Sequence, residues 1–277
     1  MTDRPHSPIQ DPRVNAVIAR LQGARQRPSD GGPRGASGSR DPHAYAGLGF
    51  SIHPEQGELI YLLCRGLRAT RVAEFATSVG MSTLYFAAAI RDNGGGTVIG
   101  SEIVPAKVEA AKRNLAEAGL ADYAEIREGD ARKTLRDLAG PVDFVLIDGW
   151  PGEGGPSLAR EVIEIVAPQL LVGGYVMNDN AEPDYLDYIR DPNNGFVSMT
   201  LPLKGGTELS LKVSEGCGPQ SLARPDGQNT QPAGQRVAPK IFHFTEIRKR
   251  RMCRGNPAQG RGAYRDRHER GPDGGGR

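Results

Sequence analysis

Long apolar runs are missing from this sequence of 277 residues, in which no stretch approaches the ~20 apolar residues that cross a bilayer. The first 30 residues also lack the apolar segment of a secretory signal. We therefore expect a soluble, cytoplasmic protein with no membrane partner.

Closely spaced cysteines are missing as well. Cys64, Cys217 and Cys253 lie far apart in the sequence, so they fit neither a zinc-binding spacing nor a disulfide framework. We expect reduced thiols without a catalytic role.

A surplus of positive charge is missing outside the carboxyl-terminal segment. Residues 216–277 hold 13 Lys and Arg against 5 Asp and Glu, whereas the preceding residues carry a net charge of −6. A nucleic-acid footprint would therefore be confined to this segment, and we do not expect the folded body to bind nucleic acid.

Composition divides the chain into three parts. Residues 1–45 combine helical spacing at 11–25 with a Gly-rich, Pro-rich and Ser-rich linker, and residues 215–277 are again poor in residues that could form a core. We predict a helix with a flexible linker at 1–45, a folded domain at 46–214 and a disordered basic tail at 215–277.

Strands and helices alternate within the predicted domain. A helix is expected to begin at Pro54, and near-continuous apolar strands follow, which predict a parallel sheet covered on both faces. The run GFVSMTLPLKGGTELSLKV adds two β-rich segments joined by Lys-Gly-Gly, which predicts an antiparallel hairpin at the sheet edge. The fold class is thus α/β, a doubly wound and mostly parallel sheet. The predicted strands are 71–75, 97–101, 124–127, 142–147 and 174–178, and the helices between and after them are about 81–92, 105–118, 131–139, 157–167 and 182–190.

Acidic residues stand at or just beyond the ends of these strands. Ligands of open α/β sheets bind outside the carboxyl ends of the strands, so these acids should share one rim. An acidic rim disfavours an anionic dinucleotide and suits a ligand with a sulfonium, an amino group and ribose hydroxyls, as in S-adenosylmethionine. The acids are Glu74, Glu102, Asp130, Asp148 and Asp179.

A nucleotide-dependent dehydrogenase is the competing interpretation of this rim. Glu102 alone does not discriminate, because dehydrogenases also place an acid on the ribose. The first turn, Ala-Thr-Ser-Val-Gly, lacks the G-x-G-x-x-G pattern, which disfavours that class.

Several ordered motifs resemble the small-molecule O-methyltransferases related to catechol and caffeoyl-CoA methyltransferases. They are AEFATSVGMSTLYFAAAIRDNGGGTVIGSEIVPAKVEAAKRNLAEAG, IREGDA, VLIDGW, GGYVMNDN and TELSLKV, within about residues 48–213. The resemblance implies a seven-stranded Rossmann-like sheet, an S-adenosylmethionine cofactor and methyl transfer to a hydroxyl of a small, aromatic molecule. It also suggests a homodimer.

The same resemblance assigns roles to single positions. The first cofactor motif matches Glu74, Thr77, Gly80 and Ser82, with Ser82 where the methionine carboxylate would sit. Glu102 matches the ribose acid, Asp130 and Ala131 flank the adenine, and Ile52 belongs to the segment that covers the cofactor. Asp148 matches both a cofactor contact and the catalytic residue; with Asp179 and Asn180 it also matches the ligands of a divalent cation.

A metal at these last three positions is chemically reasonable without the resemblance. Two carboxylates and an amide at adjacent strand ends are hard oxygen donors that suit Mg²⁺. The metal would orient a substrate hydroxyl and lower its pKa.

Two departures from the family pattern leave a second function open. Ala76 stands where the first glycine of the cofactor turn is usual, and its methyl group would be unfavourable if the backbone must take a positive φ. Pro151 replaces a lysine that follows the aspartate in many relatives, and Lys204 is the nearest downstream lysine. The alternative is a degenerate methyltransferase that binds the cofactor without efficient turnover. Trp150 is a further candidate for the acceptor pocket.

Overall fold

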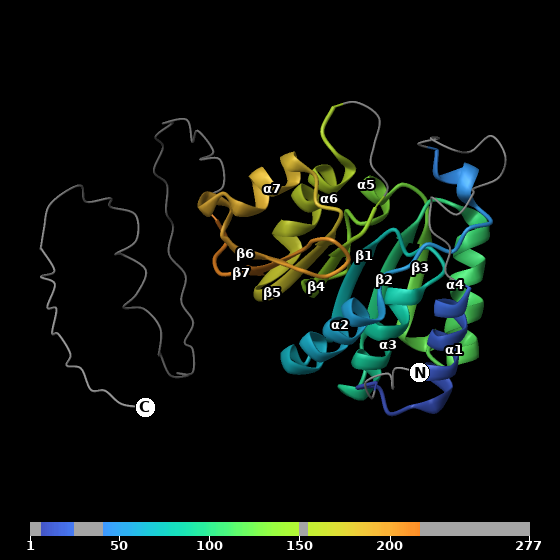
Figure 1. The fold of residues 1–277 in the computed structure, drawn as a ribbon. Coiled ribbons are helices and arrows are strands. Elements are labelled where there is room, and N and C mark those ends of the chain that lie inside the picture. Colours follow the sequence, from blue (N-terminus) through green and yellow to red (C-terminus); the bar gives the residue numbers. More distant parts are fainter. Residues whose placement is uncertain (1–6, 25–40, 150–154, 217–277) are drawn as a thin grey trace, which may run out of the picture. The chain divides into compact units, whose positions relative to one another are not determined.

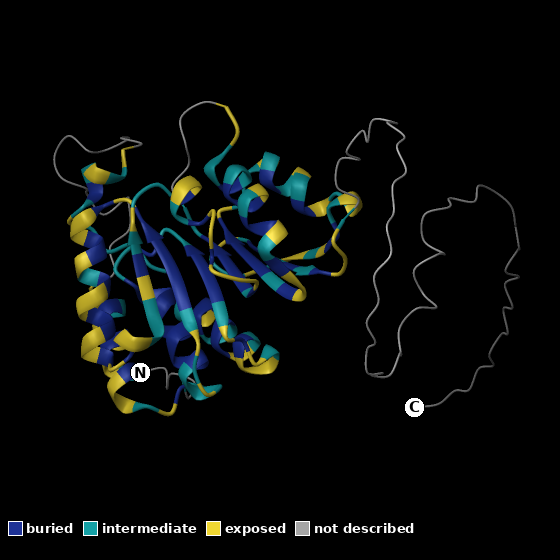
Figure 2. Ribbon diagram, turned by 180° about the vertical axis from the view of Figure 1, so that it is seen from behind, coloured by how far each residue is buried: buried dark blue, intermediate teal, exposed yellow. Residues whose placement is uncertain are grey.

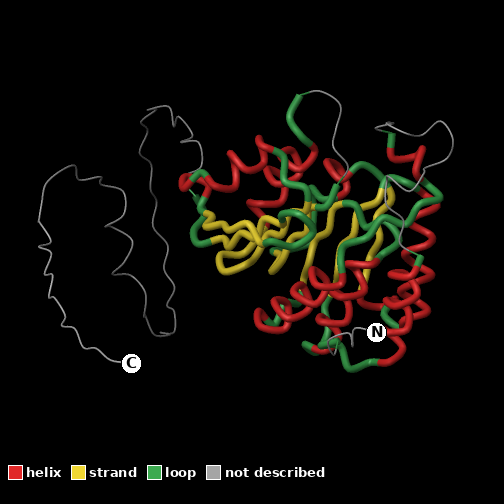
Figure 3. The backbone as a smooth tube through the Cα atoms, in the orientation of Figure 1, coloured by secondary structure: helices red, strands yellow, loops and turns green. Residues whose placement is uncertain are grey.

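The computed structural model describes residues 7–24, 41–149 and 155–216, and within them seven strands form a single sheet between two layers of helices (Figures 1 and 3). The predicted fold class, a Rossmann-like α/β sheet that is mostly parallel, is confirmed. The predicted linker, the basic tail and Trp150 lie outside the described residues. None of the helices in the described ranges has the length and apolarity needed to span a membrane.

The order of the strands places a switch point in the middle of the sheet. The strand order is β3-β2-β1-β4-β5-β7-β6, so the chain moves outward from β1 and then returns to the other side of β1 as β4. β7 runs antiparallel to both of its neighbours, β5 and β6, which confirms the predicted hairpin at the edge. The strands are β1 (Arg71–Phe75), β2 (Thr97–Glu102), β3 (Ala124–Glu128), β4 (Val142–Ile147), β5 (Leu170–Asp179), β6 (Phe196–Leu201) and β7 (Thr207–Lys212).

The helices cover the two faces of the sheet in groups that follow the sequence. One face carries α1 (Pro12–Gly23), α2 (Pro54–Leu67), α3 (Met81–Asp92) and α4 (Pro105–Ala118). The other carries α5 (Ala131–Thr134), α6 (Leu158–Val166) and α7 (Pro183–Arg190). The central strands and α3 are almost entirely buried, whereas one side of α4 is exposed (Figure 2). Two apolar clusters, one on each face, thus hold β1 and β4 rigidly.

Helix α1 packs into the same core as the helices that follow it. Asp11 caps its first turn by accepting hydrogen bonds from two backbone N–H groups, and Val14, Val17, Ile18 and Leu21 are buried. The guanidinium of Arg13 donates to the carbonyl oxygen of Ala116 near the end of α4, at 3.0 Å.

Two predicted elements have other lengths in the structure. The helix predicted at 131–139 ends at Thr134, because Arg127 on β3 donates to the carbonyl groups of Thr134 and Asp137, and Ala139 takes a positive φ of 55°. The strand predicted at 174–178 spans Leu170–Asp179 and accommodates its extra length through a register shift against β4.

Candidate functional site

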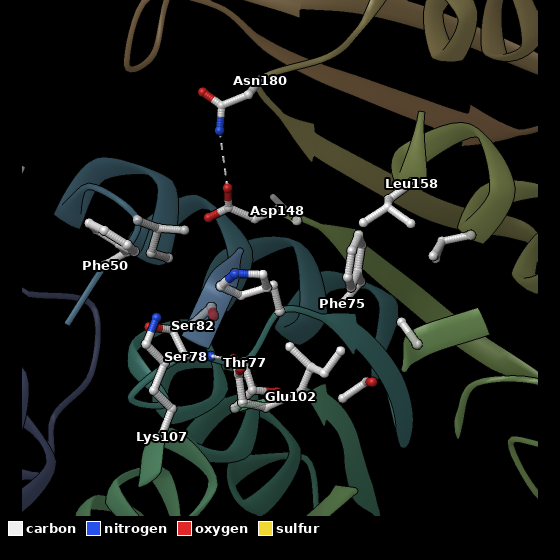
Figure 4. Close-up of a pocket in the computed structure, with 18 of the residues that line it drawn as sticks. Phe50, Phe75, Thr77, Ser78, Ser82, Glu102, Lys107, Asp148, Leu158 and Asn180 are labelled. Carbon is white, nitrogen blue, oxygen red and sulfur yellow. Dashed lines mark hydrogen bonds between the residues drawn. The ribbon is translucent and has the colours of Figure 1, made fainter. Parts of the chain in front are cut away.

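A cavity of about 670 Å³ lies at the carboxyl ends of β1, β2 and β4, where the strand order reverses (Figure 4). Most of the residues predicted for the site line this cavity. Glu74, Gly80 and Asp179 do not line it but lie directly behind the lining residues. The predicted residues that line it are Ile52, Thr77, Ser82, Glu102, Asp130, Ala131, Asp148 and Asn180.

Glu74 forms the floor beneath the turn that follows β1. Its carboxylate is fully buried and accepts hydrogen bonds from the hydroxyls of Ser82, Thr83 at 2.7 Å and Thr77 at 3.2 Å. Burial raises the pKa of Glu74, although these hydroxyls lower it in part. Because Ser82 is the second residue of α3, its backbone N–H has no acceptor within the helix and can serve an anionic ligand group.

The turn between β1 and α3 has an unusual backbone. Ala76, Ser78 and Gly80 take positive φ values of 67°, 51° and 86°. The N–H groups of Ala76 and Thr77 both donate to the carbonyl oxygen of Ser101 on β2, at 3.0 and 3.1 Å, which fixes the turn. The condition under which Ala76 is unfavourable is therefore met.

Glu102, at the end of β2, lines one end of the cavity. Its two oxygens accept from the backbone N–H groups of Ser78 at 2.7 Å and Val104 at 2.9 Å. Lys107 on α4 is buried nearby, and its ammonium lies 4.9 Å from the centre of the Phe50 ring. Burial lowers the pKa of Lys107, an effect that the charge of Glu102 opposes. Figure 4 shows Glu102, Lys107 and Thr77 at the end of the cavity remote from Asn180.

Asp130 stands at the side of the cavity as the capping residue of α5. It accepts a hydrogen bond from the backbone N–H of Arg132 at 2.9 Å and forms an ion pair with the Arg132 guanidinium at 2.8 Å. The hydrogen bond from Arg132 lowers the pKa of Asp130. Ala131 and Ile52 add apolar surface that suits a flat ring.

Asp148 and Asp179 meet at the other end of the cavity. Asn180 donates from its amide nitrogen to Asp148 at 3.3 Å (Figure 4) and to Asp179 at 3.4 Å. Asp179 also accepts from the amide of Gln56 at 3.0 Å and forms an ion pair with Lys204. Burial raises the pKa of Asp148, the charge of Lys204 lowers it and the carboxylate of Asp179 raises it further.

This arrangement does not fit a divalent cation at the predicted positions. One oxygen of Asp179 accepts from Gln56 and the other pairs with Lys204, while Asn180 turns its amide nitrogen toward the carboxylates. Among the described residues, no group of three or more His, Cys, Asp or Glu side chains could hold a metal ion. A metal would have to displace Lys204 and rotate Asn180.

Four residues of the site were not assigned a role from the sequence. Phe50 and Gln56 lie outside the quoted motifs, and Lys107 lies within one but was given no role there, because the positions of all three in the site depend on which elements pack together. Lys204 was noted only as the nearest lysine downstream, and the structure places it on Asp179 and in the cavity wall.

Comparisons with known proteins agree with this geometry. A family model described as a methyltransferase domain matches residues 74–181. Catechol O-methyltransferase of Mycobacterium tuberculosis is 33% identical over 142 residues, which cover 49% of this chain and 64% of that protein. A second catechol O-methyltransferase, from Niastella koreensis, is 32% identical over 149 residues, covering 50% of this chain and 66% of the relative. The chain thus matches just under two thirds of their length.

Solved structures show the same fold at lower identity. An O-methyltransferase from Bacillus cereus in complex with SAH superposes with a TM-score of 0.53 at 19% identity, over 71% of this chain and 90% of that one. A putative O-methyltransferase from Klebsiella pneumoniae gives a TM-score of 0.54 at 17% identity, over 74% and 91% of the two chains.

The sheet order and the acid-lined cavity at its switch point define a class I methyltransferase fold. Within that class, the chain is similar to catechol O-methyltransferases over about half of its length, and its residues 74–181 match a methyltransferase domain, in agreement with the resemblance found in its sequence.

Proposed function

We propose that this protein transfers a methyl group from S-adenosylmethionine to a hydroxyl of a small, aromatic molecule. The observation that carries the proposal is a single cavity of about 670 Å³ with Glu102 at one end and Asp148 at the other. Glu102 can accept hydrogen bonds from the ribose hydroxyls, and Asp148 lies beside the acceptor. The space between them holds the cofactor and its methyl group.

The cofactor is assigned to the end of the cavity formed by β1, β2 and α5. Glu102 accepts from the ribose hydroxyls, and the N-terminus of α3 at Ser82 receives the methionine carboxylate. Asp130 and Ala131 flank the adenine, and Ile52 covers it. Glu74, Thr77 and Gly80 support this binding by shaping the turn around Ala76.

The acceptor is assigned to the end that contains Asp148. Phe75 and Leu158 lie together in the adjoining wall and offer apolar contact to an aromatic ring (Figure 4). When S-adenosylmethionine is bound, the acceptor oxygen would form a bond to the methyl carbon as the carbon–sulfur bond breaks, and the electron pair of that bond would stay on the sulfur. The hydroxyl proton passes to Asp148, which faces the cavity. Catalysis then depends mainly on in-line placement.

The sequence also predicts a divalent cation and a homodimer, and both stay predictions. S-Adenosylmethionine supplies the electrophilic methyl group when bound. Since the side chains at Asp148, Asp179 and Asn180 do not fit a metal in their present arrangement, no step of the reaction is routed through one.

Isothermal titration with S-adenosylhomocysteine tests the cofactor assignment. Glu102→Gln removes one charge-assisted acceptor, so we expect Kd to rise about 10-fold to 100-fold. Glu109→Gln makes the same chemical change at an exposed site on α4 and should leave Kd unchanged. Absence of binding by the unmodified protein would remove the proposal, and equal affinities of the two variants would remove the role of Glu102.

A degenerate methyltransferase is the second candidate, favoured by the positive φ of Ala76 and by the missing lysine after Asp148. Such a protein would bind S-adenosylhomocysteine but would not methylate a panel of phenols and catechols. Turnover that is lost in Asp148→Asn, with cofactor affinity retained, would rule against it.

A further inference from the structure

The strongest unexplained feature of the cavity is a lysine that no sequence motif assigned to it. Lys204 lies between β6 and β7, where the turn is fixed by hydrogen bonds from Gly206 N–H and the Thr207 hydroxyl to the carbonyl oxygen of Leu203, at 2.8 and 3.1 Å. Lys204 itself takes a positive φ of 49°. The turn thus holds one defined backbone geometry that sends this side chain back over the end of β5.

The partner of Lys204 is a carboxylate that has almost no contact with solvent. The Asp179 side chain is 1% exposed and that of Lys204 is 22% exposed, and the two form an ion pair. The other oxygen of Asp179 accepts from Gln56. A buried carboxylate needs both a counter-charge and hydrogen bonds, and Asp179 obtains them entirely from the protein.

The local charges are therefore already balanced in part by a protein cation. Asp148 and Asp179 bring two carboxyl groups to one end of the cavity, and the charge of Lys204 acts on both. A divalent cation entering between them would come within a few ångströms of the ammonium, where the repulsion in a protein interior is large. Lysine and metal thus compete for the same place.

Lys204 also faces the acceptor. Its side chain lines the cavity together with Asp148 and Asn180, and an ammonium group has three N–H donors, of which the ion pair with Asp179 uses one. A donor therefore remains for an oxygen of a bound molecule.

We propose that the ammonium group of Lys204 serves as the cation of this site, in the place that a divalent metal would need, and binds the acceptor oxygen during methyl transfer. The part that concerns the acceptor rests on the proposed function, whereas the exclusion of metal does not. In this protein the methyl acceptor is then oriented by a side chain from the edge hairpin, and transfer needs no added metal.

Binding of Mn²⁺ to the full chain, followed by electron paramagnetic resonance, tests the exclusion of metal directly. We expect Lys204→Met to bind one Mn²⁺ at least about 100-fold more tightly than the unmodified protein, because a positive charge has been removed beside two carboxylates. Lys112→Met removes an exposed lysine on α4 and should behave like the unmodified protein. Equal Mn²⁺ affinity of the unmodified protein and Lys204→Met, whether tight or weak, overturns the proposal.

A second measurement follows the acceptor. With a methylated phenol as product, we expect chelation by EDTA to leave turnover of the unmodified protein unchanged. Lys204→Met should raise the KM for the acceptor about tenfold or more while the Kd for S-adenosylhomocysteine stays constant. Turnover that stops in EDTA and returns with Mg²⁺ contradicts the proposal.

Two further variants keep the test decisive. Lys204→Arg retains the charge and should exclude Mn²⁺ as lysine does, and Lys204→Gln replaces Lys204→Met if that variant does not fold. Should the unmodified protein bind no S-adenosylhomocysteine, the proposed function fails, yet the Mn²⁺ comparison still decides whether Lys204 excludes a metal.

Discussion

Ala76 carries strain at the start of the turn between β1 and α3. Its φ of 67° is a conformation that costs a residue with a Cβ about 1–2 kcal/mol. We expect Ala76→Gly to raise the free energy of unfolding by about 1 kcal/mol, measured by urea denaturation, because glycine adopts this φ without a penalty. The same variant should bind S-adenosylhomocysteine at least as tightly as the unmodified protein.

The matched control for Ala76→Gly is Ala110→Gly, in the interior of α4 at a half-buried position. There glycine should lower the free energy of unfolding by about 1 kcal/mol, since a helical backbone gains nothing from a residue without Cβ. Changes of the same sign in the two variants would contradict the assignment of strain to Ala76.

For single residues, the sequence predicted the positions of the acidic side chains of the site better than the position of the basic side chain Lys204. Glu74, Glu102, Asp130 and Asp148 could be placed because each stands at a strand end or begins a helix, which is a local pattern. Lys204 could not be placed, because its contact with Asp179 depends on how far the hairpin folds back over β5.

At the scale of secondary-structure elements, an ion pair joins α7 to the edge hairpin. Arg190 at the end of α7 forms hydrogen bonds from two guanidinium nitrogens to Glu208 on β7, both at 2.8 Å, and the Glu208 side chain is 1% exposed. Burial raises the pKa of Glu208, but the hydrogen bonds from Arg190 and Thr200 outweigh it and the pKa is lowered.

The lowered pKa of Glu208 determines in which direction the stability of the fold changes with pH. Glu208 contributes stability above its ordinary pKa, and the contribution is lost as the pH falls through the lowered value in the folded state. We expect Arg190→Met to lose about 1–3 kcal/mol at neutral pH, with a smaller loss in acid, where Glu208 is protonated in both proteins. Urea denaturation across an acid-to-neutral pH series measures this difference.

A control for the ion pair is Arg20→Met, which breaks an exposed pair with Glu117. Such pairs contribute about 0–1 kcal/mol, so little change is expected at any pH. A deficit of Arg190→Met that does not shrink on acidification would show that the loss comes from packing alone.

Regular elements with uninterrupted helical spacing were predicted with the right bounds, as α3 and α4 show. The helix predicted to reach residue 139 was wrong for a reason outside its own sequence: the guanidinium of Arg127 on the neighbouring strand takes carbonyl groups that a longer helix would use. Tertiary contacts of this kind leave no periodic signal.

At the scale of the whole molecule, the packing of α1 against the folded domain could not be predicted from the composition. The sequence placed the helix at 11–25 outside the folded domain of 46–214, whereas Val17 on α1 is 1% exposed in the same apolar cluster as α3 and β1. We expect Val17→Ala to lower the free energy of unfolding by about 2 kcal/mol in thermal or urea denaturation. Val213→Ala, at a residue that is 47% exposed, should have almost no effect, and equal losses would contradict the packing of α1.

The network around Asp179 also bears on how the protein is made. Gln56 bonds both Asp179 and Thr207, partners that follow it by 123 and 151 positions. A growing chain on the ribosome therefore holds Asp179 without its counter-charge Lys204 until the edge hairpin has emerged. A product truncated before the hairpin would lack Lys204, and with it the cation at this end of the cavity.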